Sequence, residues 1–229
     1  MTALRWPVPA AHPRLRRGEV HVWATKLDLP ALAAERLAGT LSPDEAARAG
    51  RLRAARDRDR YIAARGSLRT VLARYLDADP AALRFDYGAN GKPRLAGGGD
   101  APLRFNLSHA DELALIAVGR DAELGVDVER VRPLPGADAV AARVFPPTEL
   151  SRWRALPEAE RPLAFFTFWT RIEARLKARG SGIWKAPSLD DAAESLHELH
   201  PADDFVAALA VLGETRVELR TLALGPRGA

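Results

Sequence analysis

The stretch Phe168–Gly180 reads Phe-Trp-Thr-Arg-Ile-Glu-Ala-Arg-Leu-Lys-Ala-Arg-Gly, and the rest of the chain can be interpreted around it. As an α-helix it places Trp169, Glu173 and Lys177 four residues apart, so an aromatic ring, a carboxylate and an ammonium group share one face. An adjacent face carries apolar side chains at helical spacing, namely Phe165, Phe168, Ile172 and Leu176. The same pattern fits an ordinary amphipathic helix with a salt bridge, so other parts of the sequence must decide between the two interpretations.

Two acidic residues interrupt an apolar stretch upstream, at 124–131, that is typical of a buried β-strand. Asp127 and Glu129 are two residues apart, so their side chains point to the same face of that strand. Neighbouring carboxylates on an apolar strand repel each other and lose solvation, and they therefore need a cation. The pair indicates a divalent-metal site with oxygen ligands, and the alternative is an exposed edge strand with solvated acids.

The composition is that of a globular protein, with 47% hydrophobic and 28% charged residues among 229. No cysteine is present, which excludes disulfides, thiolate zinc sites and cysteine nucleophiles. The net charge of +4 indicates an anionic partner, but no recognised motif points to nucleic acid. No apolar run approaches the ~18 residues of a membrane span, and the N-terminus lacks the apolar core of a signal peptide. We expect a cytoplasmic protein with no membrane partner.

Periodicity and breaker residues predict a mixture of helices and mainly antiparallel strands, with the order strand, helices, strands occurring twice. The expected strands are 19–27, 83–87, 103–108, 112–118, 124–131, 205–212 and 216–224. The expected helices are 30–37, 42–55, 57–76, 137–145, 146–156 and 157–180. We expect residues 109–111 to form the turn of a hairpin, and the last two strands to pair with each other in antiparallel fashion. The fold class is therefore α+β, with a duplicated unit.

Three other motifs carry weaker signals. Ser108 and His109 are adjacent, so on an extended strand they point to opposite faces and form a poor nucleophile–base pair. The segment Gly-Lys-Pro-Arg at 91–94 lacks the Walker pattern of a phosphate-binding loop. Arg60 and Arg65 project from an arginine-rich helix, and they are either solvated surface charges or a grip for phosphate.

Three segments taken together closely resemble the signature of the 4′-phosphopantetheinyl transferases. They are 105–109 (Phe-Asn-Leu-Ser-His), 125–129 (Gly-Val-Asp-Val-Glu) and 169–177 (Trp-Thr-Arg-Ile-Glu-Ala-Arg-Leu-Lys). Chain length and motif order are similar to those of the monomeric, surfactin-synthetase-activating branch. The resemblance implies a pseudo-dimer of two similar halves, each a small, mainly antiparallel sheet packed with helices, with coenzyme A in the cleft between them. We place the half that grips the 3′-phosphate and adenine at 1–120, and the half with the metal site and catalytic helix at 121–229.

The resemblance also implies an activity, the Mg²⁺-dependent transfer of the 4′-phosphopantetheine arm of coenzyme A to a serine of an acidic apo acyl or peptidyl carrier protein. Asp127, Glu129 and Glu173 are expected to hold Mg²⁺, with Mn²⁺ as an alternative ion, and Glu149 matches another acid near the metal. Within the catalytic group of Asp127, Glu173 and Lys177, Glu173 is expected to act as general base and Lys177 to stabilise the leaving group. The residues expected to bind coenzyme A are Arg60, Arg65, Lys92, Pro93, Ser108, His109 and Lys177. We expect the protein to be a monomer.

One position departs from the family's pattern, because Ile172 stands where members usually have a lysine before the glutamate. Ile172 lies in line with Phe168 and Leu176, a position suited to packing. We therefore expect activity to be retained, and the substitution Ile172→Lys to raise it modestly or leave it unchanged. Two alternatives are a homologue that binds coenzyme A or the carrier with little or no catalysis, and another Mg²⁺-dependent transferase acting on diphosphate-linked nucleotides or sugars.

Overall fold

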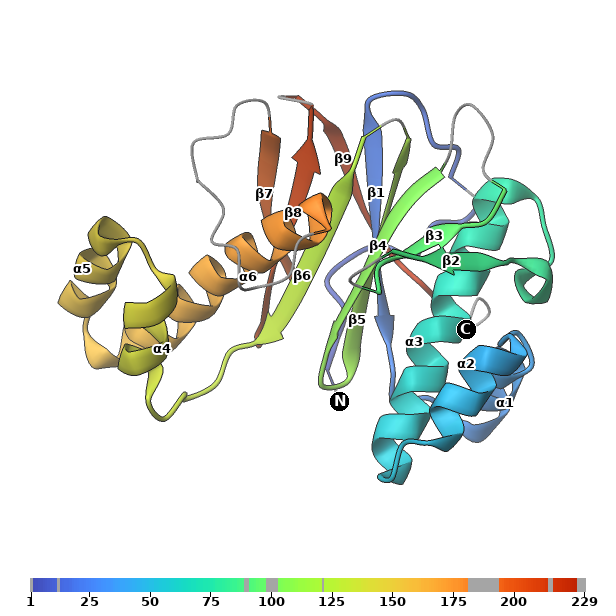
Figure 1. The fold of residues 1–229 in the computed structure, drawn as a ribbon, viewed down its shortest axis with the longest axis horizontal. Coiled ribbons are helices and arrows are strands. Elements are labelled where there is room, and N and C mark those ends of the chain that lie inside the picture. Colours follow the sequence, from blue (N-terminus) through green and yellow to red (C-terminus); the bar gives the residue numbers. More distant parts are fainter. Residues whose placement is uncertain are drawn as a thin grey trace.

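The structure is a computed structural model that describes residues 2–11, 13–88, 91–97, 103–120, 122–180, 194–213 and 216–225. These residues form two halves, each a small sheet with helices on its outer side, and the two sheets face each other at the centre of the molecule (Figure 1). The expected α+β fold with two mainly antiparallel halves is confirmed.

The first half is built on a four-stranded sheet with the strand order β4-β5-β1-β9. Its strands are β1 (Glu19–Lys26), β4 (Leu103–Ala110), β5 (Leu113–Arg120) and β9 (Glu218–Ala223). The other elements of this half are α1 (Ala31–Ala38), α2 (Pro43–Gly50), α3 (Ala55–Leu76), the 3₁₀ turn η1 (Pro80–Ala82) and the paired strands β2 (Phe85–Tyr87) and β3 (Pro93–Leu95). Leu68 and Leu72 of α3 pack on Trp23 of β1, so this helix covers the outer face of the sheet.

The second half is built on a three-stranded antiparallel sheet with the order β6-β8-β7. Its strands are β6 (Leu124–Arg130), β7 (Glu194–Ala202) and β8 (Phe205–Leu212). Its helices are α4 (Ala137–Val144), α5 (Pro147–Ala155), the 3₁₀ turn η2 (Glu158–Glu160) and α6 (Arg161–Arg179). The long helix α6 lies across the sheet and ends at Gly180, whose φ of 65° suits a glycine C-cap. Neither α6 nor any other described helix is long and apolar enough to span a membrane.

The inner faces of the two sheets pack together in one apolar core. Val22 and Leu115 of the first sheet belong to the same buried cluster as Val128 and Leu209 of the second. Each fully buried side chain of this kind contributes about 1.5–3 kcal/mol, so the halves are joined as firmly as the interior of a single domain. The edge strands β4 and β6, which carry two of the quoted motifs, lie side by side at this junction.

Some expected boundaries and pairings are wrong. β9 does not pair with β8; it runs parallel to β1 in the other sheet, where Leu222 joins the core beneath α3. The hairpin turn lies at Asp111 and the residue after it, because β4 continues through Ala110 and Asp111 adopts a φ of 48°. The helix expected over 42–55 ends at Gly50. Strand β7 is not predicted by the sequence pattern, because its polar alternation is that of an edge strand.

Candidate active site

Small residues bring α6 close to the strands beneath it. The buried alanines at this contact are Ala174 and Ala178 of α6 and Ala208 and Ala210 of β8. Gly125 of β6 faces the backbone of the helix directly. Because so little separates the two elements, side chains that leave α6 one turn apart reach those of β6. This contact places Glu173 and Lys177 near Asp127.

Two side chains of β4 connect the two sheets at their adjoining edges. Asn106 and Ser108 are two residues apart on one face of the strand, and both are buried. The side-chain oxygen of Asn106 accepts a hydrogen bond of 2.9 Å from the backbone N–H of Val126, and Ser108 Oγ donates one of 2.9 Å to Asp127 Oδ1. Since β4 and β6 belong to different sheets, these bonds hold the two strands in register.

An ion pair between Asp127 and Lys177 lies at the centre of the site. Lys177 Nζ donates to Asp127 Oδ1 at 2.6 Å and to Ser108 Oγ at 2.9 Å. Asp127 is only 4% exposed, and its other oxygen, Oδ2, has no hydrogen-bond partner within the described part of the chain. Burial raises the pKa of Asp127, while the charge of Lys177 opposes that shift. The aspartate therefore depends on a nearby cation to remain ionised.

Two further carboxylates surround this pair. Glu173 is 8% exposed, and its Oε1 is buried without a hydrogen-bond partner among the described residues. Burial raises the pKa of Glu173, and the charge of Asp127 raises it further. Burial and Asp127 likewise raise the pKa of Glu129 to about 7, against the opposing charges of Arg132 and Lys177. Three carboxylates thus interact with one ammonium group, and they give the site a local excess of negative charge.

The chemistry of this cluster fits Mg²⁺. Among the described residues, no three Asp, Glu or His side chains already stand close enough together to hold a metal ion. Asp127, Glu129 and Glu173 nevertheless supply the hard oxygen donors that Mg²⁺ prefers. A divalent cation would satisfy the two partnerless buried oxygens and relieve the repulsion that raises these pKa values. The three acids lie within electrostatic range of one another but are not arranged as a metal site, and their role as metal ligands remains a prediction.

Lys92 lies at the junction of the two halves, next to this cluster. Its Nζ donates to Glu123 Oε2 at 2.9 Å and to the backbone oxygens of Leu124 and Ala178 at 3.1 and 3.2 Å. Ala178 directly follows Lys177, so the tip of Lys92 is one residue away from the cluster along α6. Lys92, the residue before β3, therefore connects the first half to both β6 and α6 of the second.

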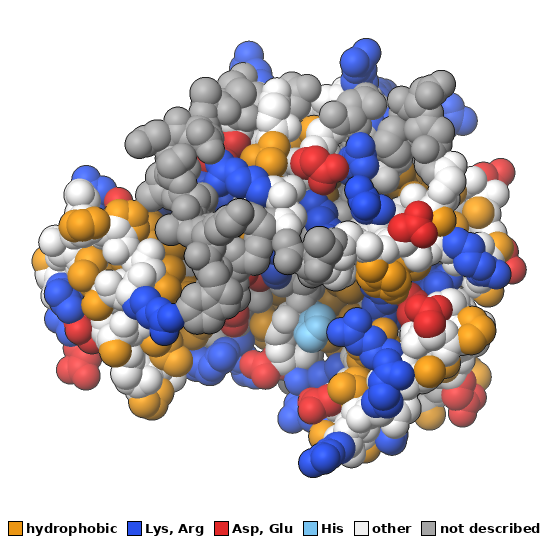
Figure 2. Space-filling view, viewed as in Figure 1, with side chains coloured by type: hydrophobic (Ala, Val, Ile, Leu, Met, Phe, Trp, Pro, Cys, Tyr) orange, Lys and Arg blue, Asp and Glu red, His pale blue; other side chains and the backbone are white. Residues whose placement is uncertain are grey.

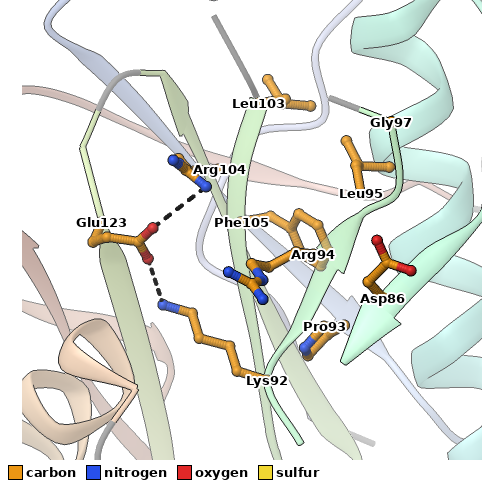
Figure 3. A pocket seen from close by; sticks show the side chains of 10 residues that line it. All are labelled: Asp86, Lys92, Pro93, Arg94, Leu95, Gly97, Leu103, Arg104, Phe105 and Glu123. Carbon is orange, nitrogen blue, oxygen red and sulfur yellow. Dashed lines mark hydrogen bonds and ion pairs between the residues drawn. The ribbon is translucent and has the colours of Figure 1, made fainter. Parts of the chain in front are cut away.

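A cavity of about 350 Å³ opens beside Lys92 and Pro93 (Figure 3). Lys92 and Arg104 both extend toward Glu123, and Arg94 also lines the cavity. A second cavity of about 480 Å³ shares Lys92, Arg94 and Glu123 and reaches the C-terminal end of α6. The Lys92 and Pro93 region thus provides a basic, concave surface in contact with both halves.

His109 and Arg60 lie on another side of the cluster. His109 is exposed at the end of β4, and partial desolvation of its ring and the charges of Lys177 and Arg60 lower its pKa. Arg60 donates to both carboxylate oxygens of Asp28, at 2.7 and 2.9 Å. Figure 2 shows the surface hollowed between the two halves, with a histidine side chain at its wall and charged side chains along its rim.

Arg65 and Glu149 make other contacts. Arg65 is buried in the first half, where it donates to Glu45 Oε1 at 2.8 Å and to the Tyr87 hydroxyl at 2.9 Å. Glu149 accepts a hydrogen bond of 3.0 Å from Arg152 on its own helix. A contact between Arg65 and coenzyme A would therefore compete with a buried ion pair.

Ile172 belongs to the apolar core of the second half. It is 7% exposed and lies in one buried cluster with Phe145, Phe165 and Val206. The expectation that this position serves packing is confirmed. Asn106 and Gly125, by contrast, lie within the quoted motifs, but the sequence pattern assigns no role to either. The signal that could have indicated Asn106 is its spacing of two residues from Ser108 on a buried strand.

Fold and cluster together define a two-halved α+β protein with an acidic, lysine-containing site where the halves meet. Comparison with known families shows which class this is. The model of the 4′-phosphopantetheinyl transferase superfamily matches residues 123–209, and the model of the N-terminal part of 4′-phosphopantetheinyl transferases matches residues 32–120. The two matches fall on the two halves in order.

Curated relatives agree with the family models. The 4′-phosphopantetheinyl transferase HetI of Nostoc is 42% identical over 209 residues, which are 85% of this chain and 88% of the relative. A putative 4′-phosphopantetheinyl transferase of Synechocystis is 35% identical, and the match covers 71% of this chain and 65% of the relative. The 4′-phosphopantetheinyl transferase AcpT of Salmonella typhimurium is also 35% identical, and the match covers 64% of this chain and 74% of the relative. The chain therefore belongs to the 4′-phosphopantetheinyl transferase family and is an enzyme of that class. Its placement in the surfactin-synthetase-activating branch remains a prediction.

Proposed function

We propose that this protein transfers the 4′-phosphopantetheine arm of coenzyme A to a serine hydroxyl of an apo carrier protein, giving the holo carrier and 3′,5′-ADP. The observation that carries the proposal is the cluster at the junction of the halves in which Lys177 pairs with Asp127 and interacts electrostatically with Glu129 and Glu173. The relatives are named for this transfer, and the cluster supplies the two kinds of group that the reaction needs, carboxylates and an ammonium.

Asp127, Glu129 and Glu173 would hold Mg²⁺ or Mn²⁺, which when bound neutralises the diphosphate of coenzyme A. Glu173, the carboxylate that α6 contributes to the cluster, accepts the proton of the carrier serine. The serine oxygen then bonds to the phosphorus that carries the pantetheine arm. The bond from that phosphorus to the bridging oxygen breaks, and 3′,5′-ADP leaves with the electron pair. Lys177 stabilises the charge that develops on this leaving group.

Coenzyme A would extend from the cluster along the first half. Lys92 and Pro93 line the concave surface on one side, while His109 and Arg60 stand on the other. The positive charges of Lys92 and Arg60 suit the 3′-phosphate, the His109 ring suits the adenine end of the ligand, and the Ser108 hydroxyl suits a phosphate oxygen. Arg65 would join them only by leaving Glu45, so we expect its contribution to binding to be smaller than that of Lys92.

The test is mass spectrometry of a purified apo acyl carrier protein incubated with coenzyme A, Mg²⁺ and this protein. The expected result is a mass gain of one phosphopantetheine arm on the carrier, lost when a chelator removes the metal. Glu149→Gln is a matched control for Glu173→Gln, because Glu149 pairs with Arg152 outside the cluster. Wild-type protein that binds coenzyme A but gives no mass gain would instead support a binding homologue without catalysis.

The carrier is proposed to dock by charge. Such carriers are acidic around the modified serine, whereas this chain has 34 Lys and Arg residues against 30 Asp and Glu. Attraction between exposed charges weakens as salt shortens the screening length from about 30 Å at 0.01 M to about 10 Å at 0.1 M. The apparent affinity for the carrier should fall over this range, and an affinity independent of salt would exclude electrostatic docking. Both walls of the site come from one chain, so we propose a monomer, which size-exclusion chromatography with light scattering would test.

A further inference from the structure

Lys177 neutralises the most deeply buried of the three carboxylates. Its Nζ lies 2.6 Å from Asp127 Oδ1 and 2.9 Å from Ser108 Oγ. The Asp127 side chain is 6% exposed, whereas that of Lys177 is 30% exposed. The lysine can therefore move toward solvent on its flexible four-carbon stem, but the aspartate is fixed on its strand.

A divalent cation and the Lys177 ammonium make opposing demands on Asp127. A metal that takes Asp127 as a ligand either displaces the ammonium or lies within a few ångströms of it, and both outcomes weaken metal binding. Asp127 Oδ2, which is buried and has no hydrogen-bond partner among the described residues, gives the metal a point of attachment while Oδ1 still holds Lys177. A metal at Oδ2 still repels that ammonium, and the repulsion is relieved only when Lys177 moves to another anion.

We propose that Lys177 is an internal counter-ion that makes the binding of the metal and of coenzyme A mutually dependent. Without coenzyme A, Lys177 pairs with Asp127 and the metal binds weakly. The diphosphate of coenzyme A offers Lys177 a second anion and draws it away, so that Asp127 becomes available to the metal. Each ligand then strengthens the binding of the other by the same factor, as linkage requires. The identity of the two ligands rests on the proposed function.

The test is a titration of the whole protein with Mn²⁺, followed by calorimetry or by the electron paramagnetic resonance signal of free Mn²⁺. It is run with and without coenzyme A and corrected for Mn²⁺ bound by free coenzyme A. In the wild type we expect coenzyme A to tighten Mn²⁺ binding about tenfold. In Lys177→Gln we expect Mn²⁺ alone to bind about tenfold more tightly than in the wild type, with a smaller further gain from coenzyme A, because only the direct contact between the diphosphate and the metal remains.

Two other variants show whether the position and charge of Lys177 matter. Lys177→Arg keeps a cation beside Asp127 and should retain both the weak binding of Mn²⁺ alone and the gain from coenzyme A. Arg132→Gln removes a different cation, which is 51% exposed and lies 4.0 Å from Glu129, and it should change Mn²⁺ affinity less than about threefold. Thermal unfolding confirms that each variant is folded.

Unchanged Mn²⁺ affinity in a folded Lys177→Gln would overturn the proposal, as would a wild type in which coenzyme A has no effect on Mn²⁺. The second measurement needs no variant, so it can overturn the proposal even if Lys177→Gln does not fold. Failure of the proposed function looks different. A wild type that transfers nothing to the carrier but shows the Lys177-dependent coupling would refute the transfer alone, and transfer without the coupling would refute the counter-ion alone.

Discussion

Gly125 of β6 lies directly beneath Ala174 of α6, and a Cβ at position 125 would come within 2.1 Å of the Ala174 carbonyl oxygen. The clash is with backbone atoms, so no change of rotamer can relieve it. This contact sets the distance between the strand that carries Asp127 and the helix that carries Glu173 and Lys177. The glycine that begins the Gly-Val-Asp-Val-Glu motif is therefore part of the geometry of the site.

Gly125→Ala should push α6 away from β6. We expect a loss of about 1–3 kcal/mol in the free energy of unfolding and a fall in transfer rate of about 100-fold, because displacements near 1 Å have effects of that size. Urea unfolding and carrier-transfer kinetics measure the two quantities. Gly50→Ala is the matched control, since a Cβ at the end of α2 meets nothing within 4 Å. If the two variants behave alike, the close approach does not position the site.

Glu173→Gln should separate activity from stability. The buried Glu173 carboxylate has a partnerless Oε1 and a pKa raised by burial and by Asp127, so its charged form is costly to the fold. Removing that charge should abolish transfer while leaving the melting temperature unchanged or higher. The measurements are carrier mass spectrometry and thermal unfolding, with Glu149→Gln as the matched carboxylate control. Near wild-type turnover would exclude Glu173 as base or ligand.

The elements that build the site are readable in the sequence because each carries a local pattern. The helical spacing of Glu173 and Lys177 and the alternation around Asp127 fix which face each side chain occupies, and the structure places them together. Local periodicity does not say which strands are neighbours. The pairing of β9 with β1 joins residues nearly two hundred positions apart, and its alternation fits a place beside β8 equally well.

Arg65 shows that local sequence patterns also do not reveal which residue a charged side chain pairs with. Arginines on a helix surface look alike in sequence, and the acid that pairs with Arg65 comes from another helix. That acid, Glu45, is recognisable only as a first-turn residue after Ser42, and its carboxylate does accept a hydrogen bond of 3.1 Å from the Ser42 N–H. Nothing local indicates that it also binds Arg65 and Arg69 in the interior.

Glu45→Gln should destabilise the first half strongly. Glu45 is 1% exposed and accepts hydrogen bonds from Arg65 at 2.8 Å and from Arg69 at 2.6 Å. Without the carboxylate, two buried guanidinium groups are left uncompensated, which costs about 3–5 kcal/mol. Urea unfolding at pH 7 measures this difference, and a loss below about 1 kcal/mol, as for an exposed pair, would contradict it.

The ion pairs of Glu45 with Arg65 and Arg69 also predict how the free energy of unfolding depends on pH. Burial alone would raise the pKa of Glu45, but Arg65 and Arg69 outweigh it and bring the pKa below its ordinary value of 4.5. Because the folded pKa lies below the unfolded one, this stabilisation is complete above about pH 4.5 and is lost as the pH falls through the folded value. The stability gap between wild type and Glu45→Gln should therefore narrow as the pH is lowered below 4.5. If the difference in stability between the wild type and Glu45→Gln instead grew as the pH fell, the pKa of Glu45 would not be lowered in the folded protein.

Ile172→Lys is the substitution for which the structure changes the expectation. From the sequence, a lysine here should be tolerated or modestly beneficial; in the structure Ile172 is 7% exposed among aromatic side chains. An ammonium placed there loses its solvation with no acid assigned to it, so we expect a loss of about 3 kcal/mol or more in unfolding free energy. Ile172→Val, which removes one methylene and adds no charge, should cost only about 0.5–1.5 kcal/mol.

The loss in Ile172→Lys should shrink as the pH rises toward about 10, because a lysine can be buried more easily once it is uncharged. Urea unfolding of both variants between pH 7 and 10 tests this, with transfer measured on the folded fraction. A lysine variant as stable as the wild type at pH 7 would mean that the ammonium escapes the core along α6 toward the carboxylate cluster. Position 172 would then accept the lysine that members of the family usually have there, and the apolar packing of Ile172 would be a replaceable feature of this chain.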